Sequence, residues 1–124
     1  MVSSDVRHRG HWTVVSVHGD IDVGAAPRLR SELIELLSAS DQVRLVIDLQ
    51  GADFVDSFGL GVLIGALKRA RLAGQELALT RIPPALSRTL TLVGLDRVFP
   101  TIELTDLDPP TDVHVAVDID TAAL

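Results

Sequence analysis

Two kinds of apolar segment alternate along this chain, and their order restricts the folds open to it. One kind is a short run suited to a strand, and the other carries apolar residues at the spacing of a half-buried helix. The strand-like runs are residues 12–17, 44–49, 76–80 and 98–104, with 6–9 as a hairpin partner for the first, and the helical segments are 25–39, 57–72 and 83–93. Strands separated by helices favour parallel pairing through right-handed crossovers. We predict one α/β domain in which helices pack on a mixed, partly parallel sheet of about five strands.

The end of the chain differs in composition from the rest. Residues 105–124 contain five acidic side chains and no Lys or Arg, so they carry most of the net charge of −6. Asp-Pro-Pro at 108–110 cannot continue a helix, and residues 113–119, VHVAVDI, then alternate as an edge strand would. An acidic composition is equally typical of a disordered tail. We assign 1–104 to the domain and 105–124 to an acidic tail that either adds an edge strand or stays disordered.

Composition argues against several classes of function. The chain has no cysteine, which excludes disulfides, thiolate metal sites and cysteine nucleophiles. Residues 1–104 are nearly neutral, and the chain has three Phe, one Trp and no Tyr, which argues against nucleic-acid binding. The longest apolar run, 58–67, is too short to span a membrane, and the amino-terminal residues lack a signal-peptide core. We expect a soluble cytoplasmic protein, monomeric or weakly dimeric, that binds neither nucleic acid nor membrane.

The sequence FVDSFGLGVL, residues 54–63, places a serine at the start of a helix that follows a strand and a loop. Functional groups of parallel α/β sheets gather at such positions. The unpaired N–H groups of a helix start also tolerate a phosphate well. Capping of the helix is the simpler explanation for Asp56 and Ser57. One side chain is enough for capping, however, so Ser57 is redundant in that role.

Three glycines follow the serine within the helical segment. Gly59, Gly61 and Gly65 each destabilise a helix by about 1 kcal/mol relative to Ala, and no turn explains them. We expect them to allow close approach of another backbone, either the sheet beneath or a partner protein. Phe58, with Leu60 nearby, gives this end of the helix an apolar character that fits a partner surface.

Two stretches of the chain resemble one protein family. Residues 43–100, VRLVIDLQGADFVDSFGLGVLIGALKRARLAGQELALTRIPPALSRTLTLVGLDRVFP, contain a strand ending in Asp-Leu, a loop, and Asp-Ser-x-Gly-Leu-Gly entering a helix. Residues 17–33, VHGDIDVGAAPRLRSEL, resemble the Gly-Glu-Leu-Asp segment that leads into the family's first helix. Over about residues 6–104 the chain resembles the bacterial anti-sigma-factor antagonists, which are STAS-domain proteins. The resemblance implies the STAS fold and a regulator that is not an enzyme.

The resemblance also implies roles for individual residues. Ser57 corresponds to the serine that the family's partner kinase phosphorylates, and Asp22 to an acid near that serine that helps partner recognition. The implied partner-binding residues are Asp20, Asp22, Asp56, Ser57, Phe58, Gly59, Leu60 and Gly61. Two features depart from the family pattern: Phe58 stands where Ser or Thr is usual, and the tail lacks the usual amphipathic closing helix.

The implied mechanism is a partner switch. The unmodified protein would bind an anti-sigma factor that is also a serine kinase, and so release the sigma factor. Phosphorylation of Ser57 would end binding, and a metal-dependent serine phosphatase would restore the first state. The chain would then be a phosphoacceptor with no catalytic residue and no cofactor.

A hydrolase and a metal site are weaker readings of the same residues. A hydrolase would need a general base beside Ser57, and DSFGLG is not the Gly-x-Ser-x-Gly nucleophile elbow. His18 is the histidine that the fold could bring near Ser57 for that role. The conceivable metal ligands are His8 and His11, or His18 with Asp20 and Asp22. Surface or strand positions explain these histidines more simply, and we predict no metal.

Two further alternatives keep a similar architecture. A phospho-aspartate receiver would use Asp48, near a strand end, but it needs an acidic pair after the first strand and a lysine after the last. The chain's one lysine, Lys68, lies in a helical segment. A STAS scaffold or transporter-associated module, whose serine is never modified, is the alternative function that stays open.

Overall fold

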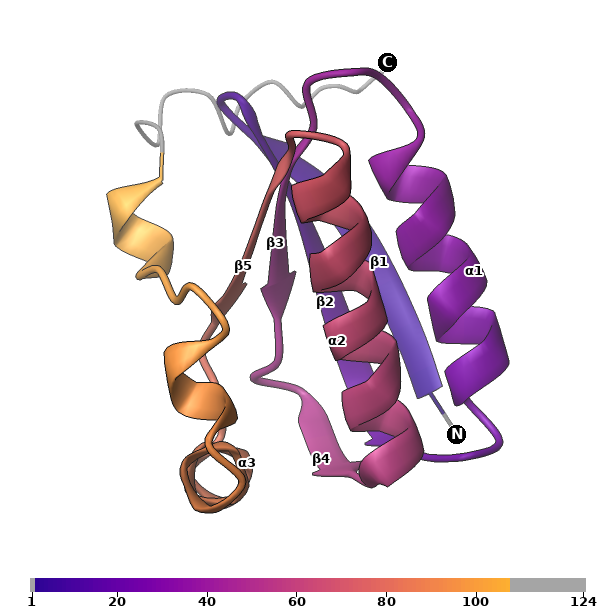
Figure 1. Cartoon of the computed structure of the whole chain (residues 1–124), viewed down its shortest axis with the longest axis vertical. Helices are drawn as coiled ribbons and strands as arrows, with labels where there is room; N and C mark the ends of the chain where they lie inside the picture. The colour runs from indigo at the N-terminus through magenta and orange to yellow at the C-terminus, as the bar shows by residue number, and fades with distance from the viewer. Residues whose placement is uncertain (1, 108–124) are drawn as a thin grey trace.

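Strands and helices alternate in the computed structural model, which describes residues 2–107 (Figure 1). The strands are β1 (Val2–Arg9), β2 (Trp12–Ile21), β3 (Arg44–Asp48), β4 (Ala52–Val55) and β5 (Glu76–Thr80). The helices are α1 (Ala26–Leu37), α2 (Ser57–Leu72) and α3 (Pro84–Leu92), followed by the 3₁₀ turns η1 (Leu95–Arg97) and η2 (Leu104–Asp106). This is the predicted α/β class. Within 2–107, no helix combines the length and the apolar character that crossing a membrane would take.

The sheet is mixed, with β1 as its antiparallel member. Its order is β1-β2-β3-β5, and β4 pairs with the far end of β2. The β1–β2 hairpin is antiparallel, whereas the β2–β3, β2–β4 and β3–β5 pairs are parallel. The parallel pairs bring the carboxyl ends of β2, β3 and β4 to one end of the sheet, where the loop into α2 begins.

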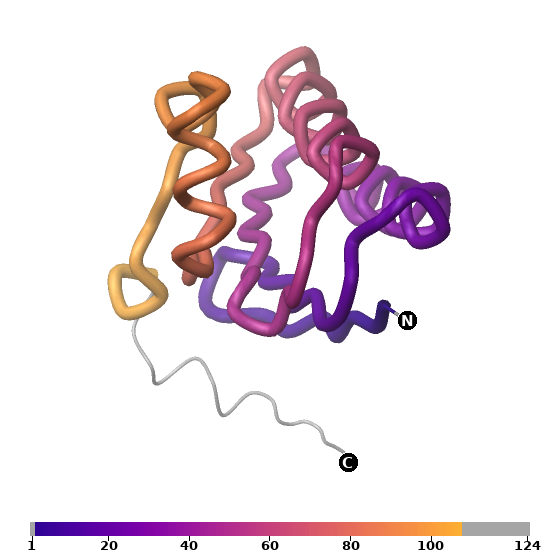
Figure 2. The backbone as a smooth tube through the Cα atoms, turned by 90° about the horizontal axis from the view of Figure 1, so that it is seen from below, coloured from indigo at the N-terminus to yellow at the C-terminus, as the bar shows by residue number. Residues whose placement is uncertain are grey.

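One face of the sheet is covered by α1 and α2, which lie side by side (Figure 1), and Figure 2 shows both on the same side of the strands. Alternate strand residues turn toward these helices, as the two-residue period of a strand requires. The core cluster on this face includes Val15, Ile47, Leu79, Leu33 of α1 and Leu63 of α2, each fully buried. This apolar layer fixes α2 on the sheet and so sets the position of Ser57.

The opposite face is only partly apolar. Trp12, Val14 and Val46 form a second, smaller cluster with Leu107, against which η2 is packed. The rest of this face is polar and carries Ser16 and Asp48, which are discussed below.

Three predicted boundaries were wrong. The first strand continues past Gly19 to Ile21, because Gly19 adopts a φ of 95° at a shift in the β2–β4 register. Residues 52–55, expected to be part of a loop, form β4 because the end of β2 offers them a partner strand. The expected strand at 98–104 is reduced to one bridge between Leu79 and Thr101, since η1 and η2 occupy its flanks. The tail at 108–124 lies outside the described residues.

Candidate functional site

Ser57 is exposed and is the first residue of α2, directly after β4 and Asp56. The Asp56 carboxylate caps the helix, because its Oδ1 accepts a hydrogen bond of 2.9 Å from the Gly59 N–H. Ser57 Oγ forms no hydrogen bond with any of residues 2–107. The hydroxyl therefore stands at the positive end of a 16-residue helix without a role in holding it.

Two acids connect this helix start to the loop after β2. The second oxygen of Asp56, Oδ2, accepts from the Val23 N–H at 3.1 Å, so one carboxylate holds both α2 and the loop. Asp22 Oδ1 accepts from the Ala25 N–H at 3.0 Å and shapes the turn into α1. Asp20 is half-buried in β2, where it pairs with Phe54 of β4. The predicted acids thus lie in adjacent segments, and Asp22 and Asp56 each have a structural task there.

The glycines of α2 face different surroundings. A Cβ added to Gly59 would come within 2.3 Å of the Ile21 carbonyl oxygen, so Gly59 allows α2 to approach the end of β2. A Cβ on Gly61 or Gly65 would meet nothing within 4 Å. Close approach to the sheet therefore explains Gly59 only, and nothing among residues 2–107 explains the other two.

Large apolar side chains are exposed near the helix start. Phe58 is 59% exposed, Val23 58% and Phe54 57%. Val23 belongs to the loop held by Asp56, and Phe54 lies on β4 just before it. Leu60, expected to join Phe58 on the surface, is instead partly buried against the core. Sequence reasoning missed Val23 and Phe54 because neither belongs to a recognisable periodic segment.

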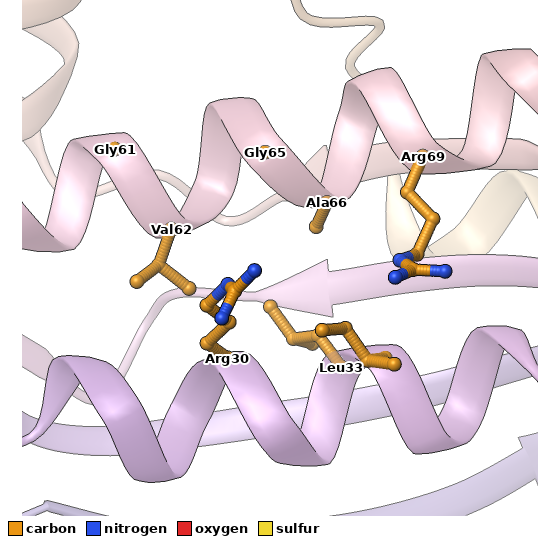
Figure 3. Close-up of a pocket in the computed structure, with 8 residues that line it drawn as sticks. Arg30, Leu33, Gly61, Val62, Gly65, Ala66 and Arg69 are labelled. Carbon is orange, nitrogen blue, oxygen red and sulfur yellow. The ribbon is translucent and has the colours of Figure 1, made fainter.

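A shallow groove of 80 Å³ runs between α1 and α2 (Figure 3). Gly61 and Gly65 line it on α2, and Arg30 of α1 and Arg69 of α2 extend into the space between the helices. Gly61 follows Ser57 by four residues, so both lie on one side of α2. In the described part of the chain neither guanidinium forms an ion pair.

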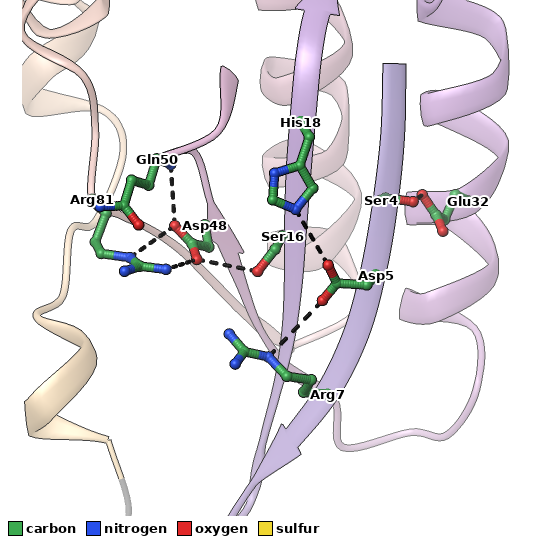
Figure 4. Close-up of polar contacts among 9 residues, drawn as sticks. All are labelled: Ser4, Asp5, Arg7, Ser16, His18, Glu32, Asp48, Gln50 and Arg81. Carbon is green, nitrogen blue, oxygen red and sulfur yellow. Dashed lines mark hydrogen bonds and ion pairs between the residues drawn. The ribbon is translucent and has the colours of Figure 1, made fainter. Parts of the chain in front are cut away.

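A second acid, Asp48, ends β3 and is surrounded by hydrogen-bond donors (Figure 4). Arg81 Nε donates to Oδ1 at 3.1 Å and Arg81 Nη2 to Oδ2 at 2.5 Å. The Gln50 N–H donates to Oδ1 and the Ser16 hydroxyl to Oδ2, each at 3.1 Å. Burial opposes ionisation of Asp48, but the hydrogen bonds from Arg81, Gln50 and Ser16 outweigh it and lower the pKa of the carboxyl. The paired guanidinium has its own pKa raised, mainly by the same hydrogen bonds.

This arrangement leaves no oxygen of Asp48 free for phosphorylation, as a receiver would require. Arg81, which belongs to no motif in the sequence, reaches Asp48 from a backbone with a φ of 50°. The segment after β5 therefore adopts the left-handed region at a residue other than glycine. No local pattern predicts such a pairing.

The histidines of the sheet lie apart from Ser57. His18 Nε2 is 3.2 Å from Asp5 Oδ2 across the β1–β2 pair (Figure 4), and His8 Nδ1 is 3.5 Å from the Thr13 hydroxyl. Between Val2 and Leu107 there is no group of three or more His, Cys, Asp or Glu side chains placed to hold a metal. Nor does any histidine there bond to Ser57, as a hydrolase base would.

Comparison with known proteins gives a consistent set of relatives. The family model described as STAS domain matches residues 3–106. The anti-sigma-B factor antagonist of Bacillus subtilis (strain 168) is 32% identical over 94 residues, which are 76% of this chain and 84% of that protein. The anti-sigma F factor antagonist of Paenibacillus polymyxa is 30% identical over 93 residues, 75% of this chain and 79% of that protein. The crystal structure of an anti-sigma factor antagonist from Mycobacterium paratuberculosis has a TM-score of 0.69 at 29% identity, covering 82% of this chain and 85% of that one.

Proposed function

The chain belongs to the STAS domain family, and on this premise we propose that it is an anti-sigma-factor antagonist that acts by partner switching. Its unphosphorylated form binds a kinase-type anti-sigma factor in the cytoplasm and thereby releases a sigma factor. Phosphorylation of Ser57 by that partner ends binding, and a serine phosphatase restores it. The chain itself is a phosphoacceptor and performs no catalysis.

The observation that carries this proposal is that Asp56 makes the hydrogen bonds at the start of α2, whereas Ser57 makes none. Asp56 makes both the cap of α2 and the bond to Val23. Ser57 is exposed and its hydroxyl has no partner among residues 2–107. A kinase is therefore able to reach the hydroxyl without disturbing the helix, and a phosphate there removes no interaction that the fold uses.

The energies are adequate for a switch. Changing a complex from 99:1 to 1:99 takes about 5.5 kcal/mol of differential affinity. A phosphate adds about −1.5 to −2 charges, and in the free protein the helix start stabilises it by roughly 0.3 to 2 kcal/mol. In a complex the phosphate would be desolvated beside Asp56 and Asp22, which costs several kcal/mol more. The affinity for the partner therefore falls although the fold does not change.

The apolar side chains around Ser57 give the partner something to bury. Phe58, Val23 and Phe54 are each more than half exposed, and aromatic side chains contribute heavily to binding when a partner covers them. Phe58 replaces the Ser or Thr usual in the family, so we infer that the partner's surface facing it is apolar. Asp20, Asp22, Asp56 and Gly61 complete the proposed binding surface. Gly59, which the family resemblance also implied, is buried against Ile21, and Leu60 packs partly against the core, so both support this surface from beneath.

The direct test uses the purified chain with ATP and a purified kinase-type anti-sigma factor from the same organism. Mass spectrometry should find one phosphate on Ser57, absent in Ser57→Ala. In a binding assay the Ser57→Ala variant should form a complex that no longer dissociates when ATP is added. The Ser57→Asp variant should not bind measurably. Ser31→Asp, which adds the same charge at an exposed serine of α1, is the matched control and should bind normally.

A second reading, an unmodified STAS scaffold, predicts a different result. In that case Ser57→Asp would bind its partner as well as the parent does, and ATP would transfer no phosphate to Ser57. That result would contradict partner switching. Superimposable amide NMR spectra of the two phosphorylation states, outside the loops around residues 20–25 and 50–57, would support the local electrostatic mechanism.

A further inference from the structure

The first strand of the sheet, β1, has one edge that no other strand covers in the described residues. It stands at the end of the order β1-β2-β3-β5 and pairs on one side with β2 over its whole length, from Val2 to Arg9. On its other side no backbone group of residues 2–107 bonds to it. Unpaired strand edges readily accept a further strand, and this edge is eight residues long.

The backbone groups that point to this edge follow from the hairpin turn. Two residues, Gly10 and His11, form the turn between Arg9 and Trp12, and the strand residues that flank such a turn bond to each other. Bonded and non-bonded pairs then alternate along the hairpin, so the odd-numbered residues of β1 bond to β2. The N–H and carbonyl groups that point outward belong to the even-numbered residues Val2, Ser4, Val6 and His8.

The side chains of β1 divide between the two faces of the sheet. Ser4 Oγ donates to Glu32 Oε1 of α1 at 2.6 Å, so Ser4 and Val6, two residues apart, face the side of the helices. Val6 is 40% exposed. Asp5 and Arg7 lie on the opposite face (Figure 4), where each side chain is more than half exposed. The edge thus presents an apolar side chain on one face and an acid and a base on the other.

Asp5 and Arg7 are only loosely joined to each other. Asp5 Oδ2 is 3.2 Å from His18 Nε2, whereas Asp5 Oδ1 is 4.0 Å from Arg7 Nε. A separation of 4.0 Å is too long for a hydrogen bond. In residues 2–107 the Arg7 guanidinium therefore has no hydrogen-bond acceptor, and Asp5 Oδ1 has no donor.

These two side chains complement each other when two copies of the strand run antiparallel. With Val6 opposite the partner's Val6, Asp5 of each copy faces the partner's Arg7. Unlike charges directly opposite each other stabilise a pair of strands, and like charges destabilise it. We propose that the outer edge of β1 is the interface of a symmetric homodimer, in which two copies of β1 pair antiparallel about Val6.

The backbone restricts the pairing to this register. The outward groups belong to even-numbered residues, so Val6 pairs with the partner's Val6, and Ser4 with the partner's His8, as hydrogen-bonded pairs. Asp5 and the partner's Arg7 then form a non-hydrogen-bonded pair, in which the side chains approach most closely. A shift of two residues in either direction brings Asp5 opposite Asp5 or Arg7 opposite Arg7. Of these three registers, one alone pairs unlike charges.

The dimer is a weak one. A contact along one strand is small compared with the roughly 1,600 Å² that a standard interface buries, so association depends on protein concentration. It adds bonds from four outward-pointing residues of each copy and covers the half-exposed Val6. Charged side chains normally protect an edge strand from pairing. In β1 the order of the charges instead favours a second copy of the same strand.

The test measures the mass of the full chain by analytical ultracentrifugation over a range of protein concentrations. The parent should pass from monomer to dimer as concentration rises. Asp5→Arg and Arg7→Asp each place like charges opposite each other twice in the symmetric contact, and each should raise the dissociation constant about tenfold. Mixed in equal amounts, the two variants should form a heterodimer, since the arginines of one face the aspartates of the other. Asp41→Arg, the same change at an exposed residue between α1 and β3, is the control and should dimerise as the parent does.

Amide hydrogen exchange by NMR locates the contact. The outward-pointing Val6 amide should be protected in the dimer and should exchange faster on dilution. The Arg7 amide bonds to β2 and should not change, so it also reports whether each variant is folded.

The proposal is overturned if the parent stays monomeric at all concentrations, if the two charge variants dimerise as the parent does, or if their folded mixture forms no heterodimer. Protection of Val6 that does not depend on concentration would mean that a segment of the same chain covers β1, and would also overturn it. For a variant that does not fold, Asp5→Asn or Arg7→Gln replaces it. Each removes the attraction without adding repulsion and should weaken the dimer by a smaller factor, and an unchanged dissociation constant would contradict the proposed register.

Discussion

Two acids lie at the carboxyl ends of β3 and β4, strands that both pair in parallel with β2, and their surroundings differ. Asp48, at the end of β3, is buried and its two oxygens accept four hydrogen bonds. Asp56, after β4, accepts two, and both donors are backbone groups of neighbouring segments. The Asp48 cluster is complete in itself, whereas the Asp56 cluster leaves the adjacent Ser57 hydroxyl without a partner in residues 2–107. The acid that its own chain saturates has a structural role, and the exposed hydroxyl beside the capped helix is the place where we propose that another protein acts.

The largest expected effect concerns the contact that holds the Ser57 end of α2 to the sheet. Gly59→Ala would place a Cβ 2.3 Å from the Ile21 carbonyl oxygen. Since backbone atoms cannot move aside cheaply, we expect a loss of about 3 kcal/mol in the free energy of unfolding, measured by urea denaturation. If the stability did not change, the start of α2 would be loosely held against β2. The Ser57 end of α2 would then lack the close contact described here.

The next effect tests the completeness of the Asp48 cluster. Asp48→Asn keeps the shape but removes the charge that Arg81 pairs with, and we expect a loss of about 2 kcal/mol at pH 7. The sign of the pH dependence follows from the lowered pKa: the stabilisation is full above the ordinary value of 3.8 and is lost as pH falls through the lower folded value. Parent and variant should therefore converge progressively in urea titrations as the pH falls from 3.8 through the lower folded pKa. A difference in the free energy of unfolding that persists below the folded pKa would assign the effect to packing.

A smaller effect tests the role of Asp56 as a cap. Asp56→Ala removes the bonds to Gly59 and Val23 and should cost about 1 to 2 kcal/mol of stability by thermal or urea unfolding. Asp56→Asn retains an oxygen able to cap and should lose much less. Asp53→Ala, at an exposed acid on β4, serves as the matched control. If the Asn variant were as unstable as the Ala variant, the negative charge and not the cap would be the stabilising feature.

The smallest expected effect is an increase in the free energy of unfolding. Gly61→Ala adds a Cβ that meets nothing within 4 Å, so it should stabilise the free protein by about 0.5 to 1 kcal/mol. If a partner backbone approaches this side of α2, the same change should weaken the complex in a binding titration. Gly65→Ala, two turns from Ser57, repeats the comparison farther along the helix. Destabilisation by Gly61→Ala would show that this side of the helix is not open.

The candidate site was predictable where local chemistry decides the structure. Asp56 is a favoured capping residue, and α2 begins at Ser57 and ends at Leu72 as the pattern predicted. The nearness of the Gly-Asp-Ile-Asp segment to the helix start was expected only from the family resemblance, and the structure shows it in the pairing of Ile21 with Val55. Prediction failed at β4 and at 98–104. Four residues carry too weak a pattern to indicate a strand, and an apolar run does not reveal that 3₁₀ turns interrupt it.

By itself the sequence determined the alternation of strands and helices, the capped start of α2 and the identity of the exposed serine. Each depends on residues only a few positions apart, whose periodicity, capping and turn preferences act locally. Only the tertiary structure decided that Arg81 saturates Asp48 and that Gly59 meets Ile21 while Gly61 meets nothing in residues 2–107. These features join residues far apart in the chain, and their geometry is fixed by how the helices pack on the sheet.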